Sequence, residues 1–170
     1  MASLVEELLS VLDEETSKYD ELYAVSTEKR ETIIHRDLEG LEKVSARESA
    51  ISGDLKNLEN KRIRVLKDMS VVLGKDDKTL TVTEVILKLA SQPKEQEALT
   101  EARDRLVKAA TNMQFMNQQN AVLLSQAIEM VEFDLTLFKS MRQAPETANY
   151  GKDAYNTGDI LPTGGFDAKQ

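Results

Sequence analysis

The 170-residue sequence contains no cysteine, no tryptophan and a single histidine, and aromatic residues make up only 5% of it. Without cysteine, disulfides and thiolate chemistry are excluded, which is compatible with the cytosol. A single histidine, His35, excludes metal sites and catalytic dyads that need two or more histidines. We therefore expect no metal site, and we interpret His35 as a solvated or capping residue at the end of the first helix.

Motifs of phosphate-binding and calcium-binding loops are also missing. The pair Gly164-Gly165 is not followed by Lys and Ser or Thr, and residues 153–158 lack acidic side chains at alternate positions. No run approaches 18 apolar residues, and the N-terminus has neither the basic region nor the apolar core of a signal peptide. The sequence predicts a cytoplasmic protein that is not an enzyme, has no catalytic residues or cofactors and does not insert in a membrane.

Acidic residues outnumber basic ones, 30 to 22, which gives a net charge of -8. Nucleic acids and anionic membrane surfaces would be repelled by this charge, so we exclude both as partners. The 31% of charged residues and the scarcity of aromatic ones are typical of long helices with narrow apolar contact stripes. One extended helical domain is the architecture that this composition favours.

Apolar residues at three- and four-residue spacing predict helices at about 3–35, 38–73, 82–90 and 93–142. The predicted fold class is all-α, an elongated antiparallel three-helix bundle or coiled coil with one short extra helix and a flexible C-terminal tail. We place the bundle at residues 1–142 and the tail at residues 143–170.

Several residues predict where these helices begin and end. Ser3 and Asp37 are candidate N-caps, and Thr81 with Glu84 forms a capping box. Gly74 tolerates the left-handed backbone that commonly ends a helix. The ends of the second helix and the start of the short helix are therefore the best-defined boundaries.

Polar residues interrupt the apolar stripes of the first two helices. Glu15, Ser26 and Lys29 break the stripe of the first helix, where we predict loose packing, and Glu48 and Arg62 are the polar exceptions in the second.

The helix from Pro93 carries more apolar surface than one neighbouring helix can cover. A first stripe is predicted to pack against the first two helices; it comprises Leu99, Ala102, Leu106, Ala109, Met113, Met116, Leu123, Ala127, Met130, Leu137 and Met141. A second face, comprising Leu124, Ile128, Val131, Leu135 and Phe138, is predicted to bind a helix of another protein. Residues 117–120, Asn-Gln-Gln-Asn, either set the register by pairing across helices or are exposed.

The last 28 residues hold 4 of the 7 glycines and 2 of the 3 prolines, and they have no helical period. They nevertheless keep five large apolar or aromatic residues: Tyr150, Tyr155, Ile160, Leu161 and Phe166. The tail is either a disordered terminus or a docking segment that orders on a partner.

The order of elements and several local motifs resemble the FlgN family of flagellar export chaperones. The second helix opens with Asp37-Leu-Glu-Gly-Leu41, and Leu80-Thr-Val-Thr-Glu-Val-Ile86 lies between helices. Asn117-Gln-Gln-Asn120 leads into Leu123-Leu-Ser-Gln-Ala-Ile128, and the tail contains Tyr150-Gly151 and Phe166-Asp-Ala-Lys169. The resemblance covers nearly the whole chain.

This resemblance implies a cytosolic chaperone that holds the hook-associated proteins of the hook–filament junction and delivers them to the flagellar export gate. The second face would then bind the cargo, and Tyr150 or Tyr155 would dock at the gate. A self-associating coiled-coil scaffold, in which a second copy buries the same face, is the alternative.

Overall fold

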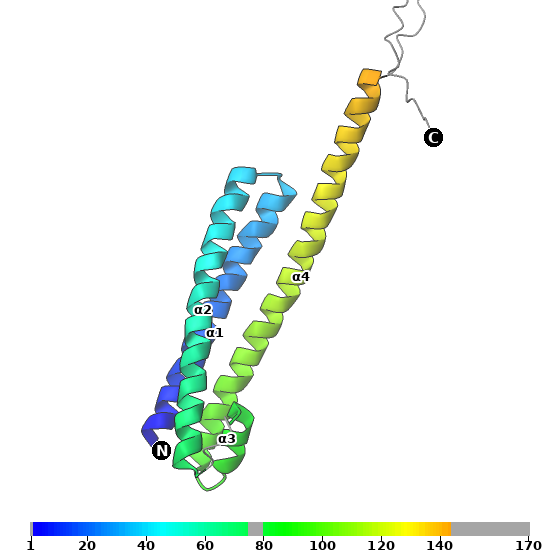
Figure 1. Cartoon of the computed structure of the whole chain (residues 1–170). Helices are drawn as coiled ribbons and strands as arrows, with labels where there is room; N and C mark the ends of the chain where they lie inside the picture. Colours follow the sequence, from blue (N-terminus) through cyan, green and yellow to red (C-terminus); the bar gives the residue numbers. More distant parts are fainter. Residues whose placement is uncertain (1, 75–79, 144–170) are drawn as a thin grey trace, which may run out of the picture. The chain divides into compact units, whose positions relative to one another are not determined.

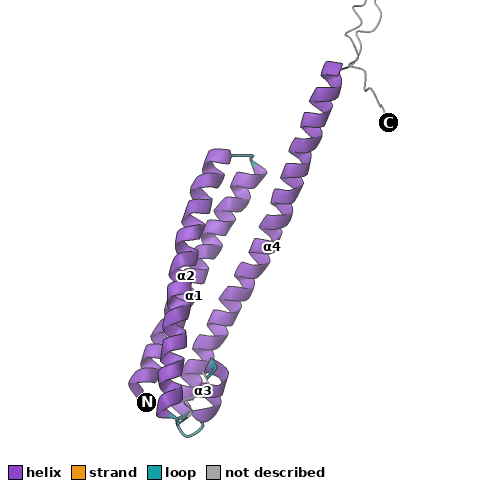
Figure 2. Cartoon of the chain, in the orientation of Figure 1, coloured by secondary structure: helices purple, strands orange, loops and turns teal. Residues whose placement is uncertain are grey.

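In the computed structural model, residues 2–74 and 80–143 are described, and they form four helices and no strand. The helices are α1 (Ala2–Ile34), α2 (Leu38–Val72), α3 (Val82–Lys88) and α4 (Pro93–Gln143). Figure 1 shows the order of these helices along the chain, and Figure 2 shows that nearly all of the described residues are helical. The all-α fold class predicted from the apolar spacing is confirmed.

The chain divides into two compact units, residues 1–131 and residues 132–170. In the first unit, α1 and α2 form an antiparallel hairpin, and α3 lies at the end of the hairpin that holds the N-terminus (Figure 1). Of the second unit, only the last part of α4, residues 132–143, is described. The predicted boundary between a bundle and a tail at residue 142 stays a prediction.

Local chemistry explains most helix boundaries. The Asp37 side chain accepts a hydrogen bond from the Gly40 backbone N–H at 2.9 Å, which satisfies one donor left open at the start of α2. Both halves of the capping box between Thr81 and Glu84 are formed. Gly74 has a φ of 67° just beyond the C-cap of α2, as predicted. Ser3 was predicted wrongly as a cap, because α1 begins at Ala2 and Ser3 lies inside its first turn.

The larger hydrophobic core lies around α3, where the N-terminal part of α1, the C-terminal part of α2 and the first turns of α4 meet. Its buried members are Val5, Leu8, Leu12, Val65, Leu66, Met69, Leu80, Val85, Ile86, Leu89, Leu99, Ala102 and Leu106. Val82 is partly buried against this cluster. The short helix α3 therefore closes this end of the first unit.

A smaller core lies nearer the turn between α1 and α2. It consists of Val25, Val44 and Ile51, with Leu22 and Leu55 partly buried beside them. Hydrophobic burial stabilises a structure roughly in proportion to the apolar area removed from water. The end of the first unit that holds α3 is thus the better stabilised one.

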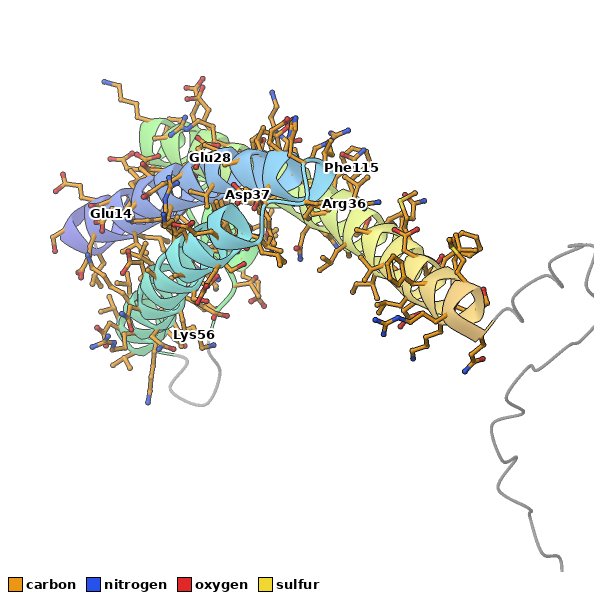
Figure 3. All side chains as sticks on the ribbon, turned by 90° about the horizontal axis from the view of Figure 1, so that it is seen from above. Glu14, Glu28, Arg36, Asp37, Lys56 and Phe115 are labelled. Carbon is orange, nitrogen blue, oxygen red and sulfur yellow. The ribbon has the colours of Figure 1, made fainter. Side chains whose placement is uncertain are left out.

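Salt bridges fix the register of the α1–α2 hairpin. Glu14 pairs with Lys61, and Glu28 pairs with Arg47. Residue numbers of the partners on α2 therefore fall as those on α1 rise, as expected for antiparallel helices. Figure 3 views the structure along the hairpin, with Glu14 and Glu28 on α1 and Arg36 and Asp37 at the turn between the helices. Exposed pairs of this kind each contribute about 1 kcal/mol or less, so they specify alignment more than they stabilise the fold.

Candidate partner-binding surface

The first half of α4 packs through one continuous apolar stripe, as predicted. Leu99, Ala102, Leu106, Ala109, Met113 and Met116 are all buried. The next residue of this stripe is Asn120, which is also buried, with 4% of its surface exposed. The prediction that Met113 and Met116 are core residues is confirmed. The buried stripe ends at the side-chain amide of Asn120.

Asn120 is held between helices by one hydrogen bond. Its Nδ2 donates to the backbone carbonyl of Ser26 on α1 at 2.8 Å. Its Oδ1 is buried, and no donor among the described residues reaches it. Of the two interpretations of residues 117–120, pairing across helices holds for Asn120, whereas Asn117 and Gln118 are exposed.

The polar breaks in α1 and α2 pair with one another next to this amide. Ser26 donates its hydroxyl hydrogen to Glu48 Oε1 at 2.8 Å, and Lys29 Nζ lies 2.7 Å from Glu48 Oε2. Ser26 is almost completely buried. Ser26 is thus buried and hydrogen-bonded, and the predicted loose packing at these positions stays a prediction.

A second polar pair lies between α1 and α2, nearer to α3 than the first pair. Arg62 Nη1 donates to Glu15 Oε2 at 2.7 Å, and only 2% of the surface of Glu15 is exposed. Burial raises the pKa of the Glu15 carboxyl above its ordinary value of 4.5, although the neighbouring Arg62 acts in the opposite direction. Glu15 is therefore buried between α1 and α2.

Beyond Asn120 the apolar side chains of α4 become accessible. In the first unit, Leu124 is half-buried, while Ile128 and Val131 are exposed at 52% and 47%. In the second unit, Leu135 and Phe138 are exposed at 56% and 67%. Four of the five predicted binding residues are therefore available to solvent in the described part of the chain, and the fifth is partly so.

The first stripe does not stay covered to Met141, contrary to our prediction. Met130, Leu137 and Met141 are exposed, as are Val122 and Phe133, which no prediction had singled out. Within the first unit, at about 100° per residue, Leu124 and Val131 continue the direction of the buried stripe, and Val122, Ile128 and Met130 broaden it. The accessible apolar surface of α4 in this unit spans about two-thirds of the helix circumference by the same geometry.

Two of the clefts between the helices of the first unit involve α4 between Ala110 and Leu123. One, of about 360 Å³, lies among α1, α2 and α4 and is lined by Tyr19, Leu22, Glu48, Ser52, Ala110, Met113, Gln114 and Asn117. The other, of about 340 Å³, lies between α1 and α4 and is lined by Arg30, Gln118, Gln119, Val122 and Leu123. The second cleft adjoins the residues at which α4 begins to expose its apolar side chains.

Contact between α1 and α4 returns at the turn of the hairpin. The guanidinium of Arg36, which follows α1 and has a φ of 55°, contacts the Met130 sulfur. Figure 3 labels Arg36 at this turn. The stretch of α4 from Ala121 to Met130 therefore runs beside the end of α1 while leaving most of its large apolar side chains exposed.

The two tail residues predicted to dock, Tyr150 and Tyr155, lie outside the described residues. In the described part of the chain, no helix combines the length and apolar character needed to cross a membrane.

Comparison with known proteins gives one match. The family model described as FlgN protein matches residues 1–158. No curated protein and no solved structure matches the chain.

Proposed function

Because the chain belongs to the FlgN family, whose members are flagellar export chaperones, we propose that it binds hook-associated proteins of the hook–filament junction in the cytoplasm. It would keep them from aggregating before export and deliver them to the export gate. The family match covers most of the chain and extends past the last described residue, so the proposal concerns the helices and the start of the tail alike.

The observation that carries this proposal is the exposed apolar surface of α4 after Asn120. Single exposed apolar residues are ordinary on a protein surface, whereas a long series on one helix marks an interaction site. Nine large apolar residues between Val122 and Met141 are exposed: Val122, Ile128, Met130, Val131, Phe133, Leu135, Leu137, Phe138 and Met141. A helix with an apolar surface this broad is expected to be covered from more than one side.

An amphipathic segment of the cargo fits this surface. Such a segment would fold as a helix against α4 and bury its own apolar side, and a typical interface would remove about 800 Å² from each partner. Ordering a flexible segment on binding consumes part of the interaction free energy, which keeps the affinity moderate. Moderate affinity suits a chaperone that must release its cargo at the gate.

The binding surface is tested by placing a charge on it. Ile128→Asp and Leu135→Asp should each weaken binding of a purified hook-associated protein by tenfold or more in calorimetry, because a carboxylate would be buried without a partner. Ser125→Asp is the matched control, since Ser125 is exposed on the polar side of the same helix. Far-UV circular dichroism should stay helical in all three variants. Unchanged affinity in both apolar variants would refute the assignment of this surface.

Self-association uses the same exposed residues and is the competing candidate. Sedimentation of the purified chain at increasing concentration separates the two functions. A stable dimer that Ile128→Asp dissociates would favour a scaffold, whereas a monomer leaves the surface open for cargo.

A further inference from the structure

Asn120 lies where the packing of α4 changes character. Met113 and Met116, two turns and one turn before it, are buried at 7% and 6%, whereas Val122 and Ile128 after it are exposed at 57% and 52%. Leu123, Leu124 and Ala127, on the side of α4 nearest the hairpin, are only half-buried. The change is not caused by the hairpin ending there, because Arg36 at its turn still contacts Met130.

The chemistry of Asn120 explains why close packing stops. Its amide must keep Nδ2 near the Ser26 carbonyl, which fixes the distance and rotation of α4 against α1 at this level. Its buried Oδ1 has no donor among the described residues, and a buried acceptor without a partner disfavours further closure around it. A single buried Asn in a helix–helix contact sets register at a cost in stability.

On the open side of Asn120 lies the cleft of about 340 Å³ between α1 and α4. It is lined by Gln118, Gln119, Val122 and Leu123 from α4 and by Arg30 from α1. We call this cleft, together with the exposed residues up to Val131, the mouth. The mouth is an opening between α1 and α4 that lies after the buried stripe ending at Asn120 and before the Arg36–Met130 contact.

We propose that Asn120 is a positioning residue that keeps the mouth open, so that a helix of the cargo can insert between α1 and α4. An apolar residue at this position would continue the stripe from Met116 to Leu124 and let α4 close onto α1. The Ser26 carbonyl would lose little, since a carbonyl in the middle of α1 also accepts a backbone hydrogen bond within its own helix. The part of this inference that concerns cargo rests on the proposed function; the part that concerns the mouth does not.

Asn120→Leu tests the inference directly. The chain has no natural cysteine, so nitroxide labels can be attached at Thr27→Cys on α1 and Glu129→Cys on α4, both exposed. In the Leu variant the distance between the labels should shorten by a few ångström, toward the spacing of about 8–10 Å between packed helix axes. The melting temperature should rise by about 4 °C or more, as a gain in packing requires in a protein of this size. Affinity for a hook-associated protein should fall about tenfold.

Two further variants keep the test decisive. Asn57→Leu, at an exposed position of α2, makes the same chemical change and should alter neither the distance nor the affinity. Asn120→Ala removes the amide without supplying an apolar contact, so it should lower the melting temperature and broaden the distance distribution. If Asn120→Leu fails to fold, an unchanged distribution in Asn120→Ala would still overturn the inference.

The remaining outcomes separate this inference from the proposed function. A Leu variant that melts lower, with an unchanged label distance, would show that Asn120 is only a structural contact. A shortened distance with unchanged affinity would show that cargo does not use the mouth. If the wild-type chain bound no hook-associated protein at all, the proposed function would fail, while the shortened distance would still stand.

Discussion

The ion pair between Glu15 and Arg62 supports a prediction that can be worked out from the structure. Only 3% of the Glu15 side chain is exposed, compared with 27% of the Arg62 side chain. Replacing Arg62 with Met keeps the length and apolar contacts of the side chain but leaves the buried carboxylate without its partner. Breaking a fully buried pair costs about 3–5 kcal/mol, and because water reaches Arg62 we expect the lower end, about 3 kcal/mol, at neutral pH.

The same prediction fixes the sign of a pH dependence. Burial already raises the pKa of Glu15 above 4.5 in the folded protein, and losing Arg62 should raise it further. Between 4.5 and this raised value the folded state binds more protons than the unfolded state, so stability falls as the pH rises through that range. The penalty of Arg62→Met should therefore be largest at neutral pH and at least halved at about pH 4, where Glu15 is protonated in both states.

Urea denaturation followed by far-UV circular dichroism at the two pH values measures this difference. Arg64→Met is the matched control, because Arg64 is exposed on the same helix and should change stability by about 0.5 kcal/mol or less. Adding Glu15→Gln to Arg62→Met should recover most of the loss, since the double variant buries no charge. An equal penalty at both pH values, or no recovery in the double variant, would refute the reasoning.

Three further predictions concern the core, the caps and the tail. Leu12→Ala should cost about 2.7–5.0 kcal/mol in urea denaturation, because Leu12 is fully buried, whereas exposed Leu87→Ala should cost little. Thr81→Ala should lower the melting temperature of the chain by about 2–4 °C through loss of the capping box. Thr83→Ala, at an exposed position two residues further on, should leave the melting temperature unchanged. Tyr150→Ala should leave calorimetric binding of a hook-associated protein intact and weaken capture by the export gate; loss of cargo binding would instead show that the tail acts on cargo.

Helix boundaries were largely predictable because they depend on neighbouring residues. The Asp37 cap, the Thr81–Glu84 box and the left-handed Gly74 each need only a few consecutive residues, and all three are present. Ser3 failed because a side chain that can cap a helix does not prevent the helix from starting earlier. Competition between two possible starts is decided by contacts outside the segment.

Polar pairing was not predictable from one helix at a time. The helical period of α1 shows that Glu15 and Ser26 interrupt its apolar stripe. It does not show that Arg62 of α2 lies opposite Glu15 and that Glu48 of α2 lies opposite Ser26. One signal was present in the sequence, however. In an antiparallel hairpin with its turn near Asp37, the breaks in α1 and α2 lie at mirrored distances from the turn, and mirrored breaks of complementary chemistry indicate pairs.

The extent of the exposed surface was underestimated for a geometric reason. Apolar spacing alone does not distinguish Met116, which is buried, from Met130, which is exposed. Burial depends on how the neighbouring helices pack, and the change that follows the buried amide of Asn120 is not visible in the spacing of apolar residues. The five residues of the second face were found by pattern, and whether they bind cargo stays a prediction.

The distribution of buried polar groups links stability to the proposed activity. Ser70 is buried beside Met69 of the large core, Glu15 and Arg62 lie at the border of that core, and the small core of Val25, Val44 and Ile51 is bordered by Ser26, Glu48 and Asn120. Buried polar pairs stabilise less than apolar packing of the same volume, so resistance to local unfolding should decrease from α3 toward the turn of the hairpin. A chaperone that admits a cargo helix between α1 and α4 needs this gradient, because only a weakly packed end can open without unfolding the rest. Amide exchange should then be slowest near Leu8 and Met69 and fastest near Ile33, and the reverse order would contradict the link between the polar layers and the open mouth.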